Sequence, residues 1–146
     1  MMKRLVLVWI LCLIVTSCTS QAASIPGADT TTPAAYVVEY VVTCPTWPDG
    51  RVHIPLINRY QRVSAGITYQ NERGGTEQIG SVGMPWSKRF RAKAGTFLHI
   101  SGQMMGTDSF PSIALDIRVQ IKVNGVVVKE ATSKGTYAVA TASVTL

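Results

Sequence analysis

Cysteine is scarce in this chain. Three cysteines occur in 146 residues, and two of them, Cys12 and Cys18, lie in the N-terminal stretch. Cys44 then stands alone in the remainder, so an internal disulfide framework is excluded there. A chain without such a framework must rely on its hydrophobic core. We interpret Cys44 as a small, half-buried hydrophobe, with an intermolecular disulfide as the alternative.

Groups suited to catalysis or metal binding are also few. Neither of the two histidines, His53 and His99, has a cysteine or carboxylate nearby at metal-ligand spacing. Eight acidic residues are spread along the chain, and no pair stands out as an acid/base couple. Nucleophile-elbow, zinc-protease and phosphate-loop patterns are absent. We therefore expect no enzymatic activity, no metal and no cofactor.

A sustained 3.6-residue apolar period is missing as well, which argues against helical structure. A period of two is present instead. From Ile113 to Val123 every second residue is apolar, so one face of a strand is buried and the other is wet. Asn124-Gly125 follows, a pair typical of a type I′ turn, and Val126–Lys129 returns. This stretch predicts a β-hairpin.

Further strand-like segments are separated by glycine and proline. The region Thr43–Tyr60, which contains three prolines, fits this pattern worst; we interpret it as a long connection with a short strand near Val52–Ile57. Short strands with a turn about every ten residues predict an all-β, immunoglobulin-like antiparallel β-sandwich of about seven strands over residues 36–146. The other segments are Tyr36–Val42, Ser64–Gln70, Thr76–Val82, Trp86–Ala92, Thr96–Gly102 and Thr136–Thr145.

The apolar run near the N-terminus, Leu5–Val15, is too short to span a bilayer as a mature anchor. A basic start precedes the run, and small residues followed by Cys18 come after it. This order predicts a lipoprotein-type signal peptide over residues 1–17, with a diacylglyceryl thioether on Cys18. The alternative is an ordinary signal cut near Ala22 or Ala23, which would give a secreted protein. Both alternatives predict export.

Residues 18–35 are mostly Ser, Thr, Ala, Gly and Pro, which cannot build a core. We interpret them as a flexible tether. The sequence thus predicts a membrane-anchored lipoprotein facing the periplasm or the cell surface. The membrane is then its first partner, through the lipid on Cys18.

The chain is basic, with 14 Lys+Arg against 8 Asp+Glu. One cluster lies in Trp86–Ala92 and just beyond, where a strand would place Arg89, Arg91 and Lys93 on one face. The stretch from Gln78 to Gln103 contains no acidic residue. We hypothesise that this face attracts an anionic envelope surface; the alternative is an edge strand that its charges keep from pairing. Export argues against nucleic acid as a partner.

A succession of short motifs runs along the chain: Tyr36–Tyr40, Ser64–Asn71, Gly74–Gln78, Met84–Ser87, Ile121–Gly125 and Ala138–Ala142. This succession resembles the exported domains of the MmpS type, which are accessory proteins of mycobacterial lipid transporters. The resemblance covers about residues 36–146 and implies the same fold and an envelope transporter as partner. Members of that family typically have a membrane-spanning N-terminus and a cysteine pair, where this chain has a lipobox-like signal and Cys44.

Two functions follow as hypotheses. The first is a non-catalytic accessory or interaction module at the cell envelope, beside a transporter. The second is a secreted or surface-anchored adhesion or ligand-binding module that uses Trp47 and the basic strand. Trp47 lies among prolines, where it is either an exposed aromatic that binds a partner or sugar, or a cap on the end of the sandwich.

Overall fold

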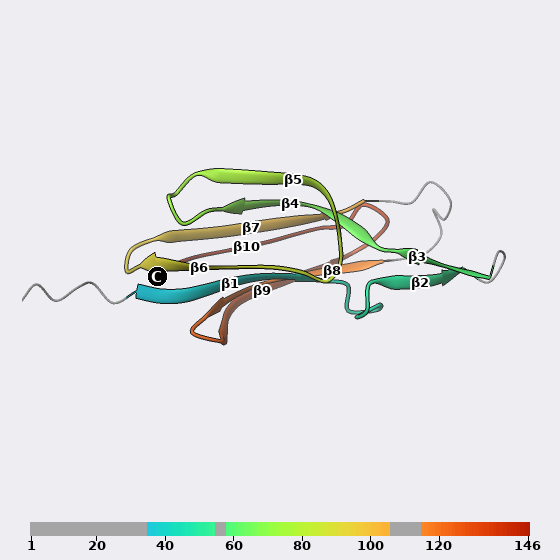
Figure 1. Ribbon diagram of the computed structural model, residues 1–146, viewed down its shortest axis with the longest axis horizontal. Coiled ribbons are helices and arrows are strands. Elements are labelled where there is room, and N and C mark those ends of the chain that lie inside the picture. Colours follow the sequence, from blue (N-terminus) through green and yellow to red (C-terminus); the bar gives the residue numbers. More distant parts are fainter. Residues whose placement is uncertain (1–34, 55–57, 106–114) are drawn as a thin grey trace, which may run out of the picture. The chain divides into compact units, whose positions relative to one another are not determined.

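The computed structural model describes residues 35–54, 58–105 and 115–146, which form strands and no helix (Figure 1). The predicted signal peptide and nearly all of the predicted tether lie outside the described residues. The all-β prediction is confirmed. The strands are β1 (Ala35–Thr43), β2 (Arg51–Ile54), β3 (Arg59–Arg62), β4 (Ser64–Gln70), β5 (Thr76–Gly83), β6 (Trp86–Lys93), β7 (Phe97–Met104), β8 (Asp116–Val123), β9 (Val126–Lys134) and β10 (Val139–Thr145).

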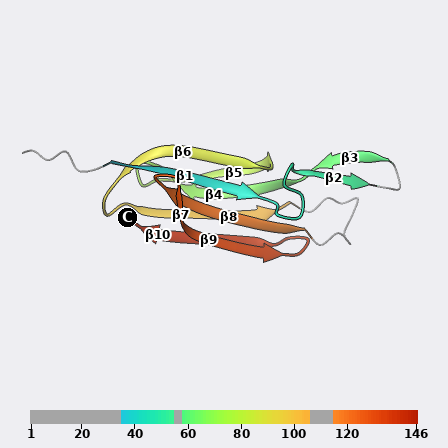
Figure 2. The same cartoon turned by 90° about the horizontal axis from the view of Figure 1, so that it is seen from below.

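Eight of these strands form two antiparallel sheets of four strands each. One sheet has the order β6-β1-β8-β9, and the other has the order β10-β7-β4-β5. The two sheets lie face to face (Figure 1), and the first runs from β6 at one edge to β9 at the other (Figure 2). The short strands β2 and β3 pair only with each other. The fold is therefore a β-sandwich with a small additional hairpin.

The core lies between the two sheets and is built by alternate residues of the central strands. Val38, Tyr40 and Val42 of β1 are fully buried, as are Ile117, Val119 and Ile121 of β8. Residues of β4 and β7 face them across the interface. Burying one such apolar side chain stabilises the fold by roughly 1.5–3 kcal/mol, so the alternation seen in the sequence accounts for the packing of the sheets. The facing residues are Ala65, Ile67, Tyr69, Leu98, Ile100 and Met104.

Tyr40 links the two sheets by hydrogen bonds. Its hydroxyl donates to the Gln70 carbonyl (3.0 Å) and accepts from the His99 backbone N–H (3.3 Å). Its ring packs against Tyr69 and Phe90, with centroids 5.9 and 5.2 Å away. Burial raises the pKa of Tyr40 to about 12. The hydroxyl therefore stays protonated, and keeps both bonds, over the whole neutral range.

The predicted hairpin around Asn124-Gly125 is confirmed. β8 and β9 pair as antiparallel neighbours, and both turn residues have positive φ, +51° and +84°. These are the backbone angles that a type I′ turn requires. Asn124 also continues the pairing of β8 with β1 into the turn. Its backbone N–H donates to the Val37 carbonyl (2.8 Å), and its side-chain Oδ1 accepts from the Val37 N–H (3.0 Å).

The prediction of about seven strands is wrong, because ten are present in the described residues. Part of the difference lies in the proline-containing region, where the sequence predicts a single short strand. β2 and β3 form a hairpin of two four-residue strands there. Strands this short carry too few residues for a visible period of two, and β3 is mostly exposed.

Candidate functional site

The basic strand predicted from the sequence is β6, which forms one edge of its sheet. Its residues alternate as expected: Arg89, Arg91 and Lys93 are exposed, while Phe90 and Ala92 turn toward the core. The structure therefore brings the three predicted cations onto one face of an exposed edge. This placement agrees with both the binding hypothesis and the hypothesis of a charge-protected edge.

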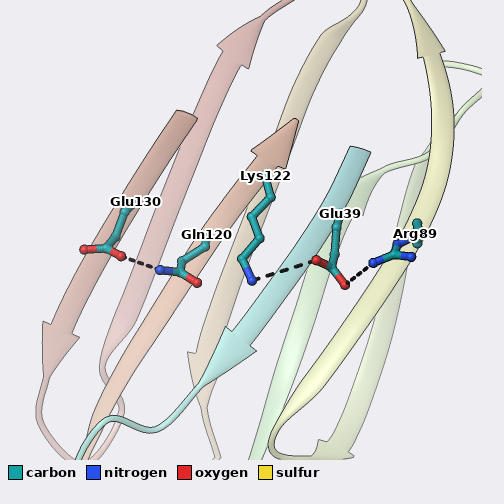
Figure 3. Close-up of polar contacts among 5 residues, drawn as sticks. All are labelled: Glu39, Arg89, Gln120, Lys122 and Glu130. Carbon is teal, nitrogen blue, oxygen red and sulfur yellow. Dashed lines mark hydrogen bonds and ion pairs between the residues drawn. The ribbon is translucent and has the colours of Figure 1, made fainter. Parts of the chain in front are cut away.

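One predicted feature of this face needs correction. The sequence around β6 lacks acidic residues, yet the fold places Glu39 of β1 directly opposite Arg89. Glu39 forms ion pairs with Arg89 (3.5 Å) and with Lys122 of β8 (3.8 Å), as Figure 3 shows. The Arg89 side chain is 70% exposed, so its ion pair contributes at most about 1 kcal/mol. Arg89 is thus partly neutralised by a residue 50 positions away in sequence.

Arg91 and Lys93 remain uncompensated. They pair across the strands with Val37 and Ala35, and within the described part of the chain neither forms an ion pair.

Farther along the same face, Gln120 donates to Glu130 of β9 at 2.5 Å (Figure 3). The face as a whole carries an excess of positive charge. By register, its basic residues are Arg89, Arg91, Lys93, Arg118, Lys122 and Lys134, and its acidic ones are Glu39, Glu130 and the buried Asp116.

The outer face of the other sheet has a different character. Among its described residues, the register places no Asp, Glu, Lys or Arg on this face. Its side chains are mainly hydroxyls and amides, and the Ser101 and Thr141 hydroxyls are 3.0 Å apart. A groove of about 290 Å³ lies on this face, where Gly66 and Gly80 leave space between strands. Its polar lining comes from Thr68, Gln78, Ser101 and Gln103. The two outer faces of the sandwich therefore differ sharply in charge.

Trp47 lies in the turn between β1 and β2. Its backbone N–H donates to the Cys44 carbonyl (3.0 Å), and its ring is partly buried against the core. The indole nitrogen is buried and, among the described residues, has no hydrogen-bond partner. This placement resembles the cap at the end of the sandwich more than an exposed aromatic for binding. Trp47 does not lie on the strand that carries Arg89, Arg91 and Lys93.

Sequence reasoning missed a buried polar pair beside Trp47. Cys44 is free and buried, and its thiol donates to Asp116 Oδ1 at 3.5 Å. The same oxygen accepts the Thr46 backbone N–H at 2.8 Å. Burial raises the pKa of the Cys44 thiol, which therefore remains a protonated donor. Burial also opposes ionisation of Asp116, but hydrogen bonds from Thr46 and Cys44 outweigh it and lower the pKa of the carboxyl group. A thiol that is buried in this way is not accessible for an intermolecular disulfide.

We expect Asp116→Asn to destabilise the fold by roughly 1.5 kcal/mol or more at pH 7, since hydrogen bonds to a charged group are stronger than neutral ones. The folded-state pKa of Asp116 lies below its unfolded value. The stabilisation is therefore present above the unfolded pKa and disappears as pH falls through the folded-state pKa. Thermal melts of wild type and variant should differ at pH 7 and converge in acid. Asp49→Asn, at an exposed aspartate that also accepts a backbone N–H, is the control; equal effects of the two variants would contradict the prediction.

The two histidines lie apart from the charged face. His53 Nε2 is 3.2 Å from Asn58 Oδ1 in the β2–β3 hairpin, and the His99 ring stacks on Phe97 of β7. Over residues 35–54, 58–105 and 115–146, no group of three or more His, Cys, Asp or Glu side chains could hold a metal ion.

Comparison with known proteins adds no family. A scan against protein-family models and a search of curated proteins both find no match for this chain. In the described residues, no helix is long and apolar enough to cross a membrane.

Proposed function

We propose that this protein is a non-catalytic exported domain, tethered to the membrane by a lipid on Cys18, that acts as an accessory or interaction module at the cell envelope. The observation that carries the proposal is the charge difference between its two outer faces. The outer face of the sheet β6-β1-β8-β9 has an excess of basic residues, and the opposite outer face has no charged residue among those described.

Such an asymmetry orients a tethered domain. Each basic residue close to an anionic surface contributes about 1 kcal/mol, and the attraction fades over a Debye length of roughly 8 Å at physiological salt. Arg91 and Lys93 contribute most, because Glu39 partly compensates Arg89. The charged sheet would then face the anionic envelope surface, and the uncharged sheet would face away. The MmpS-like motifs support an envelope transporter as a further partner of the domain at that surface.

We expect the triple change of Arg89, Arg91 and Lys93 to Ser to abolish most salt-sensitive binding of the unlipidated protein to anionic vesicles. The melting temperature should stay nearly unchanged, because all three side chains are exposed. A matched control removes three exposed arginines that lie away from this face, Arg51, Arg59 and Arg73. Vesicle binding that is absent in the wild type, or lost equally in the control, would leave β6 as a charge-protected edge.

We further propose that the sandwich is immunoglobulin-like. In that fold the sheets contain the orders A-B-E-D and G-F-C, with C′ beside C in variable-type domains. The order β10-β7-β4-β5 corresponds to G-F-C-C′, and the pair β1–β6 corresponds to B–E. The arrangement departs from the standard one because the hairpin β8–β9 follows β7 in sequence and takes the place of strand A beside β1. These correspondences support the assignment.

The second candidate function is an adhesion or ligand-binding module. The groove on the uncharged face favours it, because hydroxyl and amide side chains can donate and accept hydrogen bonds without any charge to desolvate. The two functions can be separated on a glycan array. Glycan binding that survives the Arg89/Arg91/Lys93 triple change but is lost on Gln103→Ala, in the lining of the groove, would favour a ligand-binding module that uses the groove. Loss on Trp47→Ala with an unchanged melting temperature would instead favour a ligand site at Trp47. A neighbouring gene for a multispanning transporter would favour the accessory module.

A further inference from the structure

The tip of the β8–β9 hairpin exposes a run of apolar side chains. Val126, Val127 and Val128 are 66%, 43% and 44% exposed, and Val37 beside them is 36% exposed. Three consecutive exposed valines contribute little to the core, and a sheet edge is normally protected by charged residues instead. An exposed apolar cluster with a polar rim marks a surface that contacts a partner or a membrane.

The exposure of these valines does not arise from fraying. The two hydrogen bonds between Asn124 and Val37 fix the turn to β1, and Asn124-Gly125 has the backbone angles of a regular type I′ turn. Ile121 pairs with Lys129 and Lys122 pairs with Val127, and this register shift leaves Val128 of β9 without a partner, which marks a β-bulge just after the turn. Bulges bend and twist the strand that contains them. The fold therefore holds the tip in one preformed position.

Basic residues surround this tip on three strands. Lys122 of β8 pairs with Val127, Lys129 of β9 pairs with Ile121, and Arg91 of β6 pairs with Val37. In Figure 1 the hairpin reaches past β1, away from the sheet β10-β7-β4-β5. Val37, Val127, Arg91 and Lys122 thus lie on the outer face that carries the excess positive charge, where Lys122 also forms an ion pair with Glu39. Val126 and Lys129 pair with Val123 and Ile121, which turn toward the core, so basic residues flank the tip on both faces of the hairpin.

We propose that the tip of the β8–β9 hairpin inserts into the outer layer of an anionic lipid bilayer; this inference rests on the proposed function and makes it more specific. Aliphatic side chains within a basic rim match the layering of acyl chains beneath anionic headgroups. Lysine and arginine side chains can hold their charge at headgroup level while their stems lie on apolar surface. A protein partner is less well matched, because the tip lacks the aromatic residues that anchor protein interfaces.

The test places a fluorophore at the tip of the full chain as purified from membranes. Val127→Cys, labelled with an environment-sensitive dye, should be quenched by spin-labelled lipids in vesicles containing phosphatidylglycerol. Ser143→Cys, on the uncharged outer face, is the matched control and should not be quenched. Cys44 is buried and should not take up the dye. Equal quenching at both positions, or none at either, overturns the proposal.

A second measurement separates insertion from electrostatic attraction. In the unlipidated protein, the double change Val126→Ser and Val127→Ser should weaken the salt-resistant part of vesicle binding roughly tenfold, because both substitutions remove apolar groups buried on insertion. The Arg89/Arg91/Lys93 triple change should weaken the salt-sensitive part instead. If Val127 is not quenched while the triple change still abolishes salt-sensitive binding, the insertion proposal fails and the proposed docking face stands. If Val127 is quenched but the triple change does not weaken salt-sensitive binding, the insertion proposal stands and the proposed docking face fails.

Discussion

Replacement of Gly50 by alanine is expected to destabilise the fold by about 3 kcal/mol or more, the largest loss of stability among the substitutions considered. Gly50 has φ of +67°, and a Cβ at this position would lie 1.8 Å from the Met84 carbonyl oxygen. That neighbour is backbone and cannot turn aside as a flexible side chain would. The residue is also fixed by hydrogen bonds, since its N–H donates to Trp47 O and its carbonyl accepts from Val63 N–H, both at 2.8 Å.

Thermal melts of Gly50→Ala and Gly125→Ala test this expectation. Gly125 has an even larger positive φ, +84°, but a Cβ added there would have no heavy atom within 4 Å beyond its chain neighbours, so alanine meets only the backbone penalty of about 1 kcal/mol. We expect a fall in melting temperature of more than about 10 °C for Gly50→Ala and of about 4 °C for Gly125→Ala. Equal shifts would show that the close approach of Gly50 to Met84 does not constrain the fold.

Local pattern predicted much of this fold. The boundaries of β4 and the beginnings of β5, β6 and β9 match the expected segments, because alternation and turn residues act over only a few positions. The glycine pair Gly74-Gly75 likewise lies in a turn between two of those segments. There Asn71 Oδ1 accepts the backbone N–H groups of Arg73 and Gly75, at 3.0 and 2.9 Å. Such short-range chemistry is legible in a single sequence.

The pairings between strands distant in sequence could not be predicted in this way. Nothing in the sequence of β1 indicates that Glu39 would lie between Arg89 and Lys122, which are 50 and 83 positions away. Cys44 and Asp116 are separated by 72 positions, and their hydrogen bond depends on the turn at Trp47 folding over the start of β8. The charges of the candidate face could be predicted, but the carboxylate that offsets one of them could not.

The exposed valines illustrate a related limit. From the sequence, Val126–Lys129 is predicted to be the return strand of a hairpin, but its place in the sheet is not predicted. β9 is an edge strand of its sheet, and most of its residues are exposed. Strand order decides whether a strand lies at the edge or in the centre of its sheet, and a local sequence pattern does not encode strand order. The apolar tip therefore becomes visible only once the order β6-β1-β8-β9 is established.

Substitution of Cys18 by alanine should release the protein from membranes or block its processing, the largest expected change in location. A diacylglyceryl thioether on Cys18 would give an anchor of two acyl chains, and each buried methylene contributes about 0.8 kcal/mol. Without it, the remaining attachment would be the basic face and the hairpin tip. Those contacts are weaker and, for the basic face, sensitive to salt.

Palmitate labelling followed by membrane fractionation measures this effect. Wild type should take up label and sediment with membranes, whereas Cys18→Ala should do neither. Cys12→Ala, within the apolar run Leu5–Val15, and Cys44→Ala, in the folded core, are the matched controls and should both remain labelled. Absence of label in the wild type would instead identify a protein cut near Ala22 or Ala23 and secreted. In that case the charged face and the apolar tip would have to hold the protein at the envelope by themselves. Washing the membranes with high salt would then remove the electrostatic part of the attachment, and only the contribution of the valines would remain.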